Sequence, residues 1–400
     1  MLEGVNVALG VTGSIAAVKT VELAHELRRQ GASVRAVMTD SARSIVHPWA
    51  IEFATDREVV TEITGAVEHV ELFGADGWAD VFLIAPATAN TVGKLAAAID
   101  DSPVTTCATT AIGAGVPLVI APAMHEPMYD HPGVLQAIER VESWGTDFVD
   151  PRIEEGKAKI ASEAAIVTAT ARATTEQSLA DRHVVVTSGA TTESIDPIRT
   201  LSNRASGATG RAVARACAVR GARVTLLHDP RGVAPKEDTS FATVEAVEST
   251  SEMTEAALAA CADADALISA AAIADYTVER ATEKIPSGQS ELTLTLTPTP
   301  KLVDAVREAH PELCIVGFKA ESIEDEERLV ERARSLRERV DMAFVVANET
   351  SVMGAERTHA KLVGEDWREA YEGDKPGLGA RVAEELAAPL DAGENDVTGD

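Results

Sequence analysis

An apolar strand, a loop of small residues, a helix that ends at glycine and a second apolar strand follow one another in both halves of the chain. The first copy has VNVALG at 5–10, a helical pattern at 15–30 and the strand SVRAVMT. The second copy has HVVVTSG at 183–189, a helix near 211–220 and the strand ARVTLLH. Continuous apolar strands separated by helices are typical of parallel sheets covered on both faces. The sequence therefore predicts an α/β protein with two doubly wound, Rossmann-like domains and mainly parallel sheets.

Further apolar runs add strands to both predicted sheets. They are ADVFLIAP and VPLVIAP in the first half, and ADALISAAA, LTLTLT, LCIVGFKA and MAFVVAN in the second. Residues 324–340 predict an amphipathic helix with many paired charges. A length of 400 residues suits two domains. We place them at 1–175 and 181–388, joined by an Ala/Thr-rich helix, with a disordered tail at 389–400.

The charge balance of the chain is strongly acidic. Asp and Glu number 64 against 36 Lys and Arg, for a net charge of −28. Such a surface has no basic footprint to meet phosphates, which argues against nucleic acid as a partner. The acids are spread along the whole chain, and a high net charge maintains solubility, so we interpret the protein as halophilic.

The sequence shows no sign of export or of a membrane span. No apolar run reaches the roughly 18 residues that a membrane helix needs, and the N-terminus lacks the basic region of a secretory signal. The four cysteines form no CxxC pair. These features predict a cytoplasmic protein without a membrane partner, a disulfide framework or a zinc site.

The loop GVTGS at 10–14 lies between a predicted strand and a predicted helix. Small residues let backbone N–H groups approach a phosphate, and Thr12 and Ser14 add hydroxyl groups. The loop is neither a Walker motif nor a GxGxxG fingerprint, so a phosphate monoester fits better than a triphosphate or a dinucleotide. The alternative is a structural turn in which Ser14 caps the helix.

Three later segments of the first half give this loop a context. They are EHVEL, which contains His69, then APATANTVGKLA at 85–96 and PAMHEPMY at 122–129. In order and spacing they resemble the homo-oligomeric flavin-containing cysteine decarboxylases, and in particular the phosphopantothenoylcysteine decarboxylases. The resemblance runs from about residue 4 to about residue 160.

The resemblance implies a flavodoxin-like domain that binds FMN, whose redox chemistry allows CO₂ to leave the substrate. It implies that His69 is the active-site base. It places FMN against Gly10, Thr12, Gly13, Ser14, Thr39, Thr88, Ala89, Asn90 and Ser102.

Two departures from the family pattern concern the substrate clamp and the flap. His125 stands where the family has an asparagine that holds the substrate carboxylate, whereas Met128 and Tyr129 match the rest of the clamp. Arg152 stands about where the family has a proton-donating flap cysteine. The final protonation therefore needs another donor, for which the sequence offers Lys157, Lys159, Glu155 or water.

The second half contains a long loop, TSGATTESIDPIRTLSNRASGATG at 187–210, which leads into a helix. Its glycines and hydroxyl groups suit a phosphate cradle and a polar substrate site, although an ordinary βα loop is the alternative. The segment resembles the phosphopantothenate–cysteine ligases. SAAAIADY, EKI, PTPKLV and VGFKAES follow in that family's order, so the resemblance covers about 181–385.

This second resemblance implies a nucleotide-activated ligation. Asn203 would hold the pantothenate carboxylate and its acyl-nucleotide intermediate, and Lys284, on a mobile flap, would neutralise charge at the phosphorus. The nucleotide, CTP with Mg²⁺, would contact Ser206, Gly207, Ser269, Ala270, Ala271, Asp275, Thr299, Pro300, Lys301, Leu302 and Phe318. Further lysines of the family after Phe318 find no clear match, and Arg334, Arg337 and Arg339 lie in that region. The sequence identifies no metal ligand and leaves CTP and ATP open.

Together the two resemblances imply consecutive steps of coenzyme A biosynthesis. L-cysteine is ligated to 4′-phosphopantothenate, and the product is decarboxylated to 4′-phosphopantetheine. They also imply a homo-oligomer with trimeric flavin domains and dimeric ligase domains. One alternative is an active ligase fused to a catalytically silent flavin-binding domain. Another is an NAD-dependent oxidoreductase, which is disfavoured because neither half pairs a GxGxxG loop with an acid about 20 residues later.

Overall fold

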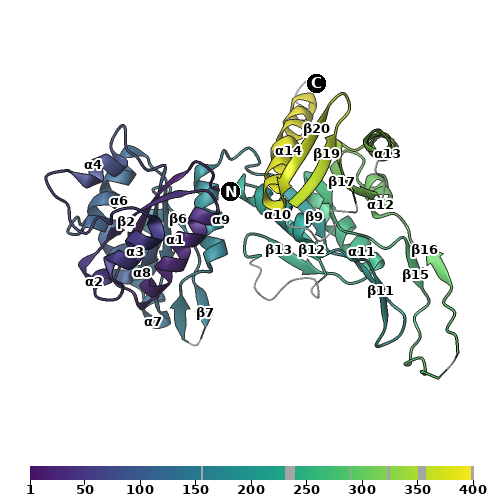
Figure 1. Cartoon of the computed structure of the whole chain (residues 1–400), viewed down its shortest axis with the longest axis horizontal. Coiled ribbons are helices and arrows are strands. Elements are labelled where there is room, and N and C mark those ends of the chain that lie inside the picture. The colour runs from purple at the N-terminus through teal and green to yellow at the C-terminus, as the bar shows by residue number, and fades with distance from the viewer. Residues whose placement is uncertain (155, 230–238, 289, 322–324, 350–356, 398–400) are drawn as a thin grey trace. The chain divides into compact units, whose positions relative to one another are not determined.

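The computed structural model describes residues 1–154, 156–229, 239–288, 290–321, 325–349 and 357–397. The chain divides into two compact units, Met1–Glu176 and Gln177–Asp400. Figure 1 colours the first unit purple to teal and the second unit teal to yellow. None of the helices in these described ranges is both long and apolar enough to cross a membrane.

The first unit is built on a five-stranded parallel sheet in the order β2-β1-β3-β4-β6. Its strands are β1 (Asn6–Val11), β2 (Ser33–Met38), β3 (Val81–Ala87), β4 (Leu118–Pro122) and β6 (Asp147–Phe148). Side chains of β3 and β4 are buried throughout, which explains their unbroken apolar sequences. This is the flavodoxin-like strand order, and the order reverses beside β1.

Helices cover the sheet of the first unit. They are η1 (Ile15–Lys19), α1 (Thr20–Arg29), α2 (Asp40–Arg43), α3 (Pro48–Thr55), α4 (Glu68–Phe73), α5 (Ala89–Ala96), α6 (Pro103–Ala114), α8 (Pro132–Glu142) and α9 (Glu163–Thr174). The core joins strands to helices, as where the rings of Phe73 and Phe82 pack with centroids 4.8 Å apart. A small antiparallel sheet, β5-β8-β7, accompanies α7 (Glu126–Tyr129). Its strands are β5 (Met124–His125), β7 (Arg152–Glu154) and β8 (Lys157–Lys159).

The second unit is built on an eight-stranded sheet in the order β13-β12-β9-β14-β17-β18-β19-β20. The strands are β9 (His183–Ser188), β12 (Arg223–His228), β13 (Thr243–Ala246), β14 (Ala266–Ser269), β17 (Cys314–Glu321), β18 (Phe344–Glu349), β19 (Arg357–Val363) and β20 (Arg368–Asp374). The first six are parallel, and β19 and β20 are antiparallel additions. Numbered along the chain, the parallel strands run 3-2-1-4-5-6, the order of dinucleotide-binding folds. The predicted fold class is confirmed in both units.

Two helices of the second unit, α10 (Ala208–Val219) and α14 (Lys375–Val397), pack closely against each other. Buried side chains from both, among them Val213, Cys217 and Val382, share one apolar core. A Cβ atom at Gly379 would lie 2.6 Å from the carbonyl oxygen of Ala212, so the two backbones are in direct contact there. The remaining helices are α11 (Thr250–Ala260), η2 (Cys261–Asp263), α12 (Leu302–Ala309) and α13 (Glu326–Val340).

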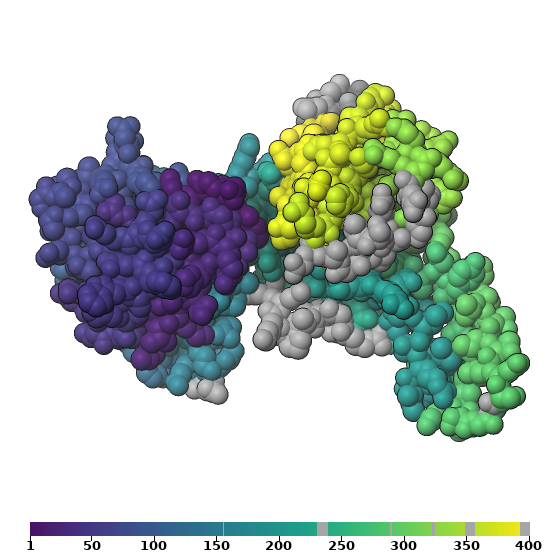
Figure 2. Space-filling model, in the orientation of Figure 1, coloured from purple at the N-terminus to yellow at the C-terminus, as the bar shows by residue number. Residues whose placement is uncertain are grey.

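Two hairpins of the second unit lie outside the main sheet, and they contact each other. They are β10 (Thr192–Ser194) with β11 (Thr200–Ser202), and β15 (Tyr276–Val278) with β16 (Leu296–Pro298). The β15–β16 hairpin projects from the sheet in Figure 1 and forms an exposed green arm in Figure 2. The prediction that LTLTLT is a strand of the main sheet is therefore wrong. Its alternating Leu and Thr side chains are exposed, as suits a two-stranded ribbon and not a buried parallel strand.

The end of the chain differs from the predicted disordered tail. Helix α14 continues through Pro389 to Val397, and residues 398–400 lie outside the described residues. Leu390 follows Leu386 by one helical turn, and both belong to the apolar core of this unit. Burial of this stripe explains why the helix extends past the proline.

All four cysteines carry free thiols. Cys107, Cys217 and Cys261 are buried, and Cys314 is half-buried at the start of β17. Each belongs to or packs against an apolar core.

The close contact of α10 with α14 predicts the effect of Gly379→Ala. Alanine is a better helix former than glycine by about 1 kcal/mol, but the added methyl group would overlap the Ala212 carbonyl. Overpacking costs about 1–3 kcal/mol, so we expect the second unit to unfold at a lower temperature. The control is Gly113→Ala in α6, where no atom lies within 4 Å of the new Cβ. Its Tm should stay equal or rise, and equal behaviour of both variants in calorimetry would refute the contact.

Candidate functional site

The loop after β1 is tied to the neighbouring loops at the carboxyl edge of the first sheet. The Thr12 hydroxyl donates to the carbonyl of Pro86 at 2.8 Å and accepts from the backbone N–H of Thr88 at 3.1 Å. The Ser14 hydroxyl donates to the carbonyl of Ala123 at 3.0 Å. A Cβ atom at Gly13 would lie 2.5 Å from the Cβ of Ser41. The edge is therefore closely packed, and only a small residue fits between the loops after β1 and β2.

Four of the hydroxyl residues predicted to meet FMN cap helices. Ser14, Thr39, Thr88 and Ser102 each accept a backbone N–H at the start of η1, α2, α5 and α6. The structural alternative for Ser14 is thus realised. A phosphate at this edge would therefore contact mainly the backbone N–H groups at the N-termini of these helices, which suit an anion. Gly10 lies within β1 against the ring of Phe82, while Ala89 and Asn90 form the first turn of α5.

His69 lies on the short helix α4. The residue before this helix, Val67, has a left-handed backbone conformation. Its Nδ1 is buried and has no hydrogen-bond partner among the described residues. An unpaired buried nitrogen costs free energy unless a ligand satisfies it. This nitrogen and the small-residue edge fit the FMN and substrate site that the sequence predicts.

The clamp and flap segments form the small antiparallel sheet. His125 of β5 pairs in register with Lys157 of β8, so the clamp residue and one candidate proton donor are neighbours. Lys159 pairs with Glu154 at 3.0 Å, and Arg152 pairs with the same carboxylate at 3.3 Å. Met128 is exposed on α7, and Glu155, another candidate donor, lies outside the described residues.

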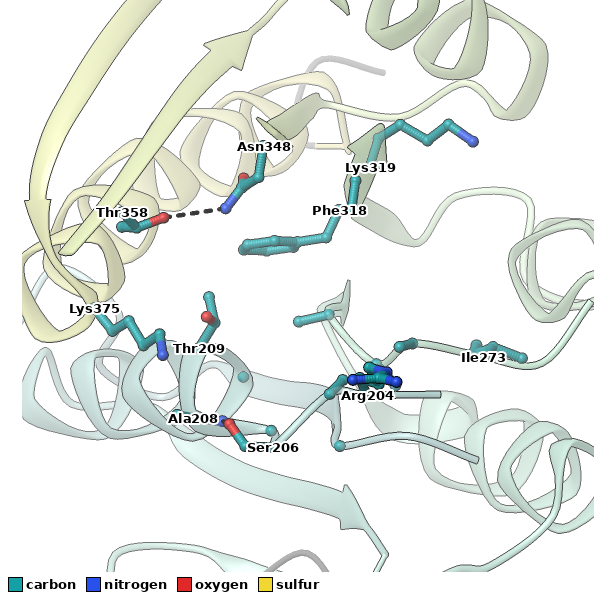
Figure 3. A pocket seen from close by; sticks show the side chains of 18 of the residues that line it. Arg204, Ser206, Ala208, Thr209, Ile273, Phe318, Lys319, Asn348, Thr358 and Lys375 are labelled. Carbon is teal, nitrogen blue, oxygen red and sulfur yellow. Dashed lines mark hydrogen bonds between the residues drawn. The ribbon is translucent and has the colours of Figure 1, made fainter. Parts of the chain in front are cut away.

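A cavity of about 340 Å³ opens at the carboxyl ends of β9, β14 and β17 in the second unit. Figure 3 shows Phe318 reaching into its centre from β17. Six residues predicted to bind the nucleotide line the cavity: Ser206, Gly207, Ala270, Ala271, Asp275 and Phe318. The position matches the crevice where doubly wound sheets bind ligands.

The phosphate-cradle part of the long loop is fixed by hydrogen bonds. Gly207 has a φ of 74° and caps α10, and its carbonyl accepts from the Ser188 hydroxyl at 2.9 Å. The Arg211 guanidinium donates to the carbonyl of Ser206 at 2.8 Å. A side chain at position 207 would lie 2.8 Å from the backbone nitrogen of Gly189. Glycine is required here both by the backbone conformation and by the space.

Other residues predicted to bind the nucleotide lie next to the cavity and do not line it. The Thr187 hydroxyl accepts both the Ala270 and the Ala271 N–H groups at 3.1 Å, so these donors are already used. Ser269 is buried beside them, and Leu302 is a core residue of α12. Thr299 and Lys301 belong to the turn that also contains Pro300. The Thr299 N–H donates to the Asp275 carbonyl at 3.0 Å, and Lys301 pairs with the Asp275 carboxylate.

Asn203 and Lys284 do not line the cavity in this conformation. The Asn203 amide donates to the carbonyl of Ala272, a lining residue, at 3.0 Å, which places Asn203 at the rim. Lys284 is exposed on the segment between β15 and β16. The neighbouring Ile285 is held by the loop that carries Asp196 and Arg199: its N–H donates to Asp196 at 3.1 Å, and its carbonyl accepts from Arg199 at 3.1 Å.

Asp196 is a buried carboxylate with several donors. Burial by itself would raise the pKa of Asp196, but N–H groups of Ile198, Arg199 and Ile285 and the Arg199 charge outweigh it and lower the pKa to about 2. The Arg199 guanidinium lies 2.6 Å from the carboxylate. The ionised aspartate therefore joins the β10–β11 hairpin to the Lys284 segment.

Sequence reasoning missed several cavity residues. They are Gly189, Arg204, Thr209, Lys319, Asn348, Thr358 and Lys375. Lys319 directly follows Phe318 and could have been found there. Thr358 and Lys375 lie on or after the antiparallel strands, which gave no clear sequence signal. Among the residues that the structure describes, no three His, Cys, Asp or Glu side chains are grouped to hold a metal ion.

The Asp196 contacts predict how stability depends on pH. Because the pKa falls from its ordinary 3.8 to about 2 on folding, the ionised group stabilises the fold above about pH 4. That contribution is lost as the pH falls towards about 2. We expect Asp196→Asn to be less stable than the parent at neutral pH, with a difference that shrinks between about pH 4 and pH 2 in denaturant titrations. Asp366→Asn, in the exposed turn between β19 and β20, should show no such trend.

Comparison with known families matches both units. The family described as Flavoprotein matches residues 1–175. The family described as DNA/pantothenate metabolism flavoprotein C-terminal domain matches residues 179–390.

Individual relatives match nearly the whole chain. The coenzyme A biosynthesis bifunctional protein CoaBC of Thermococcus kodakarensis is 48% identical over 368 residues, which cover 92% of this chain and 90% of that protein. The CoaBC of Methanocaldococcus jannaschii is 32% identical over 390 residues, covering 96% and 94%. The crystal structure of the FMN-dependent cysteine decarboxylase SpaF is 33% identical and covers 44% of this chain and 100% of its own, with a TM-score of 0.39. The identity and coverage of the two CoaBC relatives show that this chain belongs to the family of coenzyme A biosynthesis bifunctional proteins.

Proposed function

We propose that the chain carries out two consecutive steps of coenzyme A biosynthesis. Its second unit ligates L-cysteine to 4′-phosphopantothenate through an acyl-nucleotide, and its first unit decarboxylates the product to 4′-phosphopantetheine. The observation that carries the proposal is the 48% identity to a CoaBC protein over 92% of the chain. The cavity at the carboxyl ends of β9, β14 and β17 supports the ligase half.

In the ligase unit, the substrate carboxylate attacks the α-phosphate of the nucleotide and pyrophosphate leaves. Asn203 lies at the cavity rim, where its amide can hold that carboxylate after exchanging its bond to Ala272. Lys284 is outside the cavity, so it reaches the phosphorus only when its segment moves or when a second copy supplies it. We assign the nucleotide as CTP, with Mg²⁺ bound through its phosphates.

In the flavin unit, FMN would lie at the carboxyl edge of β1, β2 and β3, against residues 10–14, Thr39, 88–90 and Ser102. When bound, it supplies the reversible two-electron chemistry that lets CO₂ leave. His69 presents an unpaired buried nitrogen and acts as the base. His125 donates to the substrate carboxylate, and Lys157, its partner in register, supplies the last proton.

The alternative is a silent flavin unit fused to a working ligase. It is favoured by Arg152, which pairs with Glu154 about where the family has its flap cysteine. We propose further that the protein is a cytoplasmic, salt-adapted homo-oligomer, with trimeric flavin units and dimeric ligase units. The net charge of −28 supports salt adaptation.

A decarboxylation assay separates the active from the silent flavin unit. Purified protein in molar KCl is given 4′-phosphopantothenoylcysteine, and products are followed by mass spectrometry. We expect 4′-phosphopantetheine from the parent, and a loss of about 10²-fold or more in His69→Asn, the range for a general base. Accumulation of an oxidised, decarboxylated enethiol would mean that Lys157 does not complete the protonation. No conversion while the ligase turns over would support the silent unit.

A ligation assay tests the second unit. With 4′-phosphopantothenate, cysteine, Mg²⁺ and CTP or ATP, pyrophosphate release should fall about 10²-fold or more in Asn203→Ala, because a positioned donor is lost. Asn90→Ala, in the flavin unit, is the matched control and should keep the parent ligation rate. An unchanged rate in Asn203→Ala would exclude the assigned role of this side chain.

A further inference from the structure

Lys375 lines the nucleotide cavity but has no role in the ligation steps proposed above. It is the first residue of α14, and it is half-buried. Figure 3 shows its side chain reaching from α14 towards Ala208 and Thr209 at the start of α10. Within the described residues, Lys375 makes no ion pair or side-chain hydrogen bond, whereas most other lysines there are paired with carboxylates.

The packing of α14 on α10 determines where this lysine lies. Gly379 contacts Ala212, and one helical turn earlier on each helix Lys375 faces Ala208 across the cavity. The two helices therefore run in the same direction at this contact, and their first turns lie side by side. Helical side chains point towards the N-terminus, which directs Lys375 beyond the helix contact and over the start of α10.

The first turn of α14 is held in place independently of any ligand. The carboxylate of Asp374 accepts the N–H of Gly377 at 2.8 Å, and the carbonyl of Asp374 accepts the Tyr371 hydroxyl at 2.8 Å. Leu378 is fully buried in the core shared with α10. The backbone of Lys375 is thereby fixed, while its amine remains available to a ligand.

The other charges around the cavity explain why the amine of Lys375 matters for nucleotide binding. Lys319 pairs with Glu321 at 3.2 Å, and its side chain extends away from Lys375 in Figure 3. Arg204 lies on the far side with Ile273. The first turn of α10 contains no acidic side chain, and its one basic side chain, the buried Arg211, donates its guanidinium N–H to the carbonyl of Ser206 at 2.8 Å. A nucleoside triphosphate carries several negative charges, and a chain with a net charge of −28 repels it unless cations compensate.

The orientation of the nucleotide follows from the two ends of the cavity. Asn203, beside Arg204 and bonded to Ala272, marks the end where the acyl group meets the α-phosphate. Lys375 and the start of α10 lie at the opposite end. We infer that Lys375 binds the terminal phosphates of the nucleotide over the N-terminus of α10 and so positions the pyrophosphate leaving group. This inference rests on the proposed ligase function.

The test is nucleotide binding measured by titration calorimetry on the full chain, with Mg²⁺ at one fixed KCl concentration because salt screens the interaction. The parent, Lys375→Met and Lys375→Arg are titrated with CTP, ATP and CMP. Lys361→Met is the matched control, since it removes the same charge from β19, where Lys361 pairs with Glu326 at 2.7 Å. Thermal unfolding checks that each variant is folded.

We expect Lys375→Met to bind the triphosphate about tenfold or more weakly, the effect of losing one charged hydrogen bond. Its affinity for CMP should stay at the parent value, because the monophosphate does not reach Lys375. Lys375→Arg should recover part of the triphosphate affinity, and Lys361→Met should leave both affinities unchanged. If Lys375→Met weakens CMP and the triphosphate equally, or weakens neither, the inference is overturned while the ligase function stands. If the parent binds neither CTP nor ATP, the ligase function itself fails.

Discussion

Hydrogen bonding between buried parallel strands is the constraint on which both units depend. In each unit the first strand has a neighbour on either side, β2 and β3 beside β1, and β12 and β14 beside β9. All carboxyl ends then meet at one edge, and the chain leaves the central strands in opposite directions. The loops at that edge can approach one another only through small residues such as Gly13 and Gly207. The buried Val184–Val186 run places the strand at the centre of the sheet, and the glycine-rich loop after it allows the close approach that this position requires.

The sequence predicted the parts of the fold whose physical signal is local. Unbroken apolar runs marked the main parallel strands, and the loops after them contained most of the lining residues on the α10 side of the cavity. The antiparallel strands β19 and β20 escaped notice because they lack an unbroken apolar run: exposed side chains alternate with buried ones in the first half of β19 and with half-buried ones along β20. Lys375 could not be predicted at all. Its place depends on a backbone contact between Gly379 and Ala212, which are far apart in the sequence.

Hydroxyl side chains show why a motif alone does not define a binding site. Ser14, Thr39 and Thr88 follow strands and precede helices, as phosphate-binding residues do, and Ser102 precedes α6 after the end of α5. The same position is where a helix needs a cap, and each of these side chains accepts a backbone N–H. Thr187 is a further case, because its hydroxyl fixes the Ala270 and Ala271 N–H groups and so shapes the cavity without lining it.

The burial of the cysteines has a chemical consequence for a protein that handles thiols. Burial raises the pKa of Cys107, Cys217, Cys261 and Cys314 to about 12 in each case. Thiol–disulfide exchange requires a thiolate, which these side chains hardly form near neutral pH. Disulfides that arise by oxidation of free cysteine or of the thiol product therefore meet no reactive thiolate among these four side chains, and exchange with them is slow.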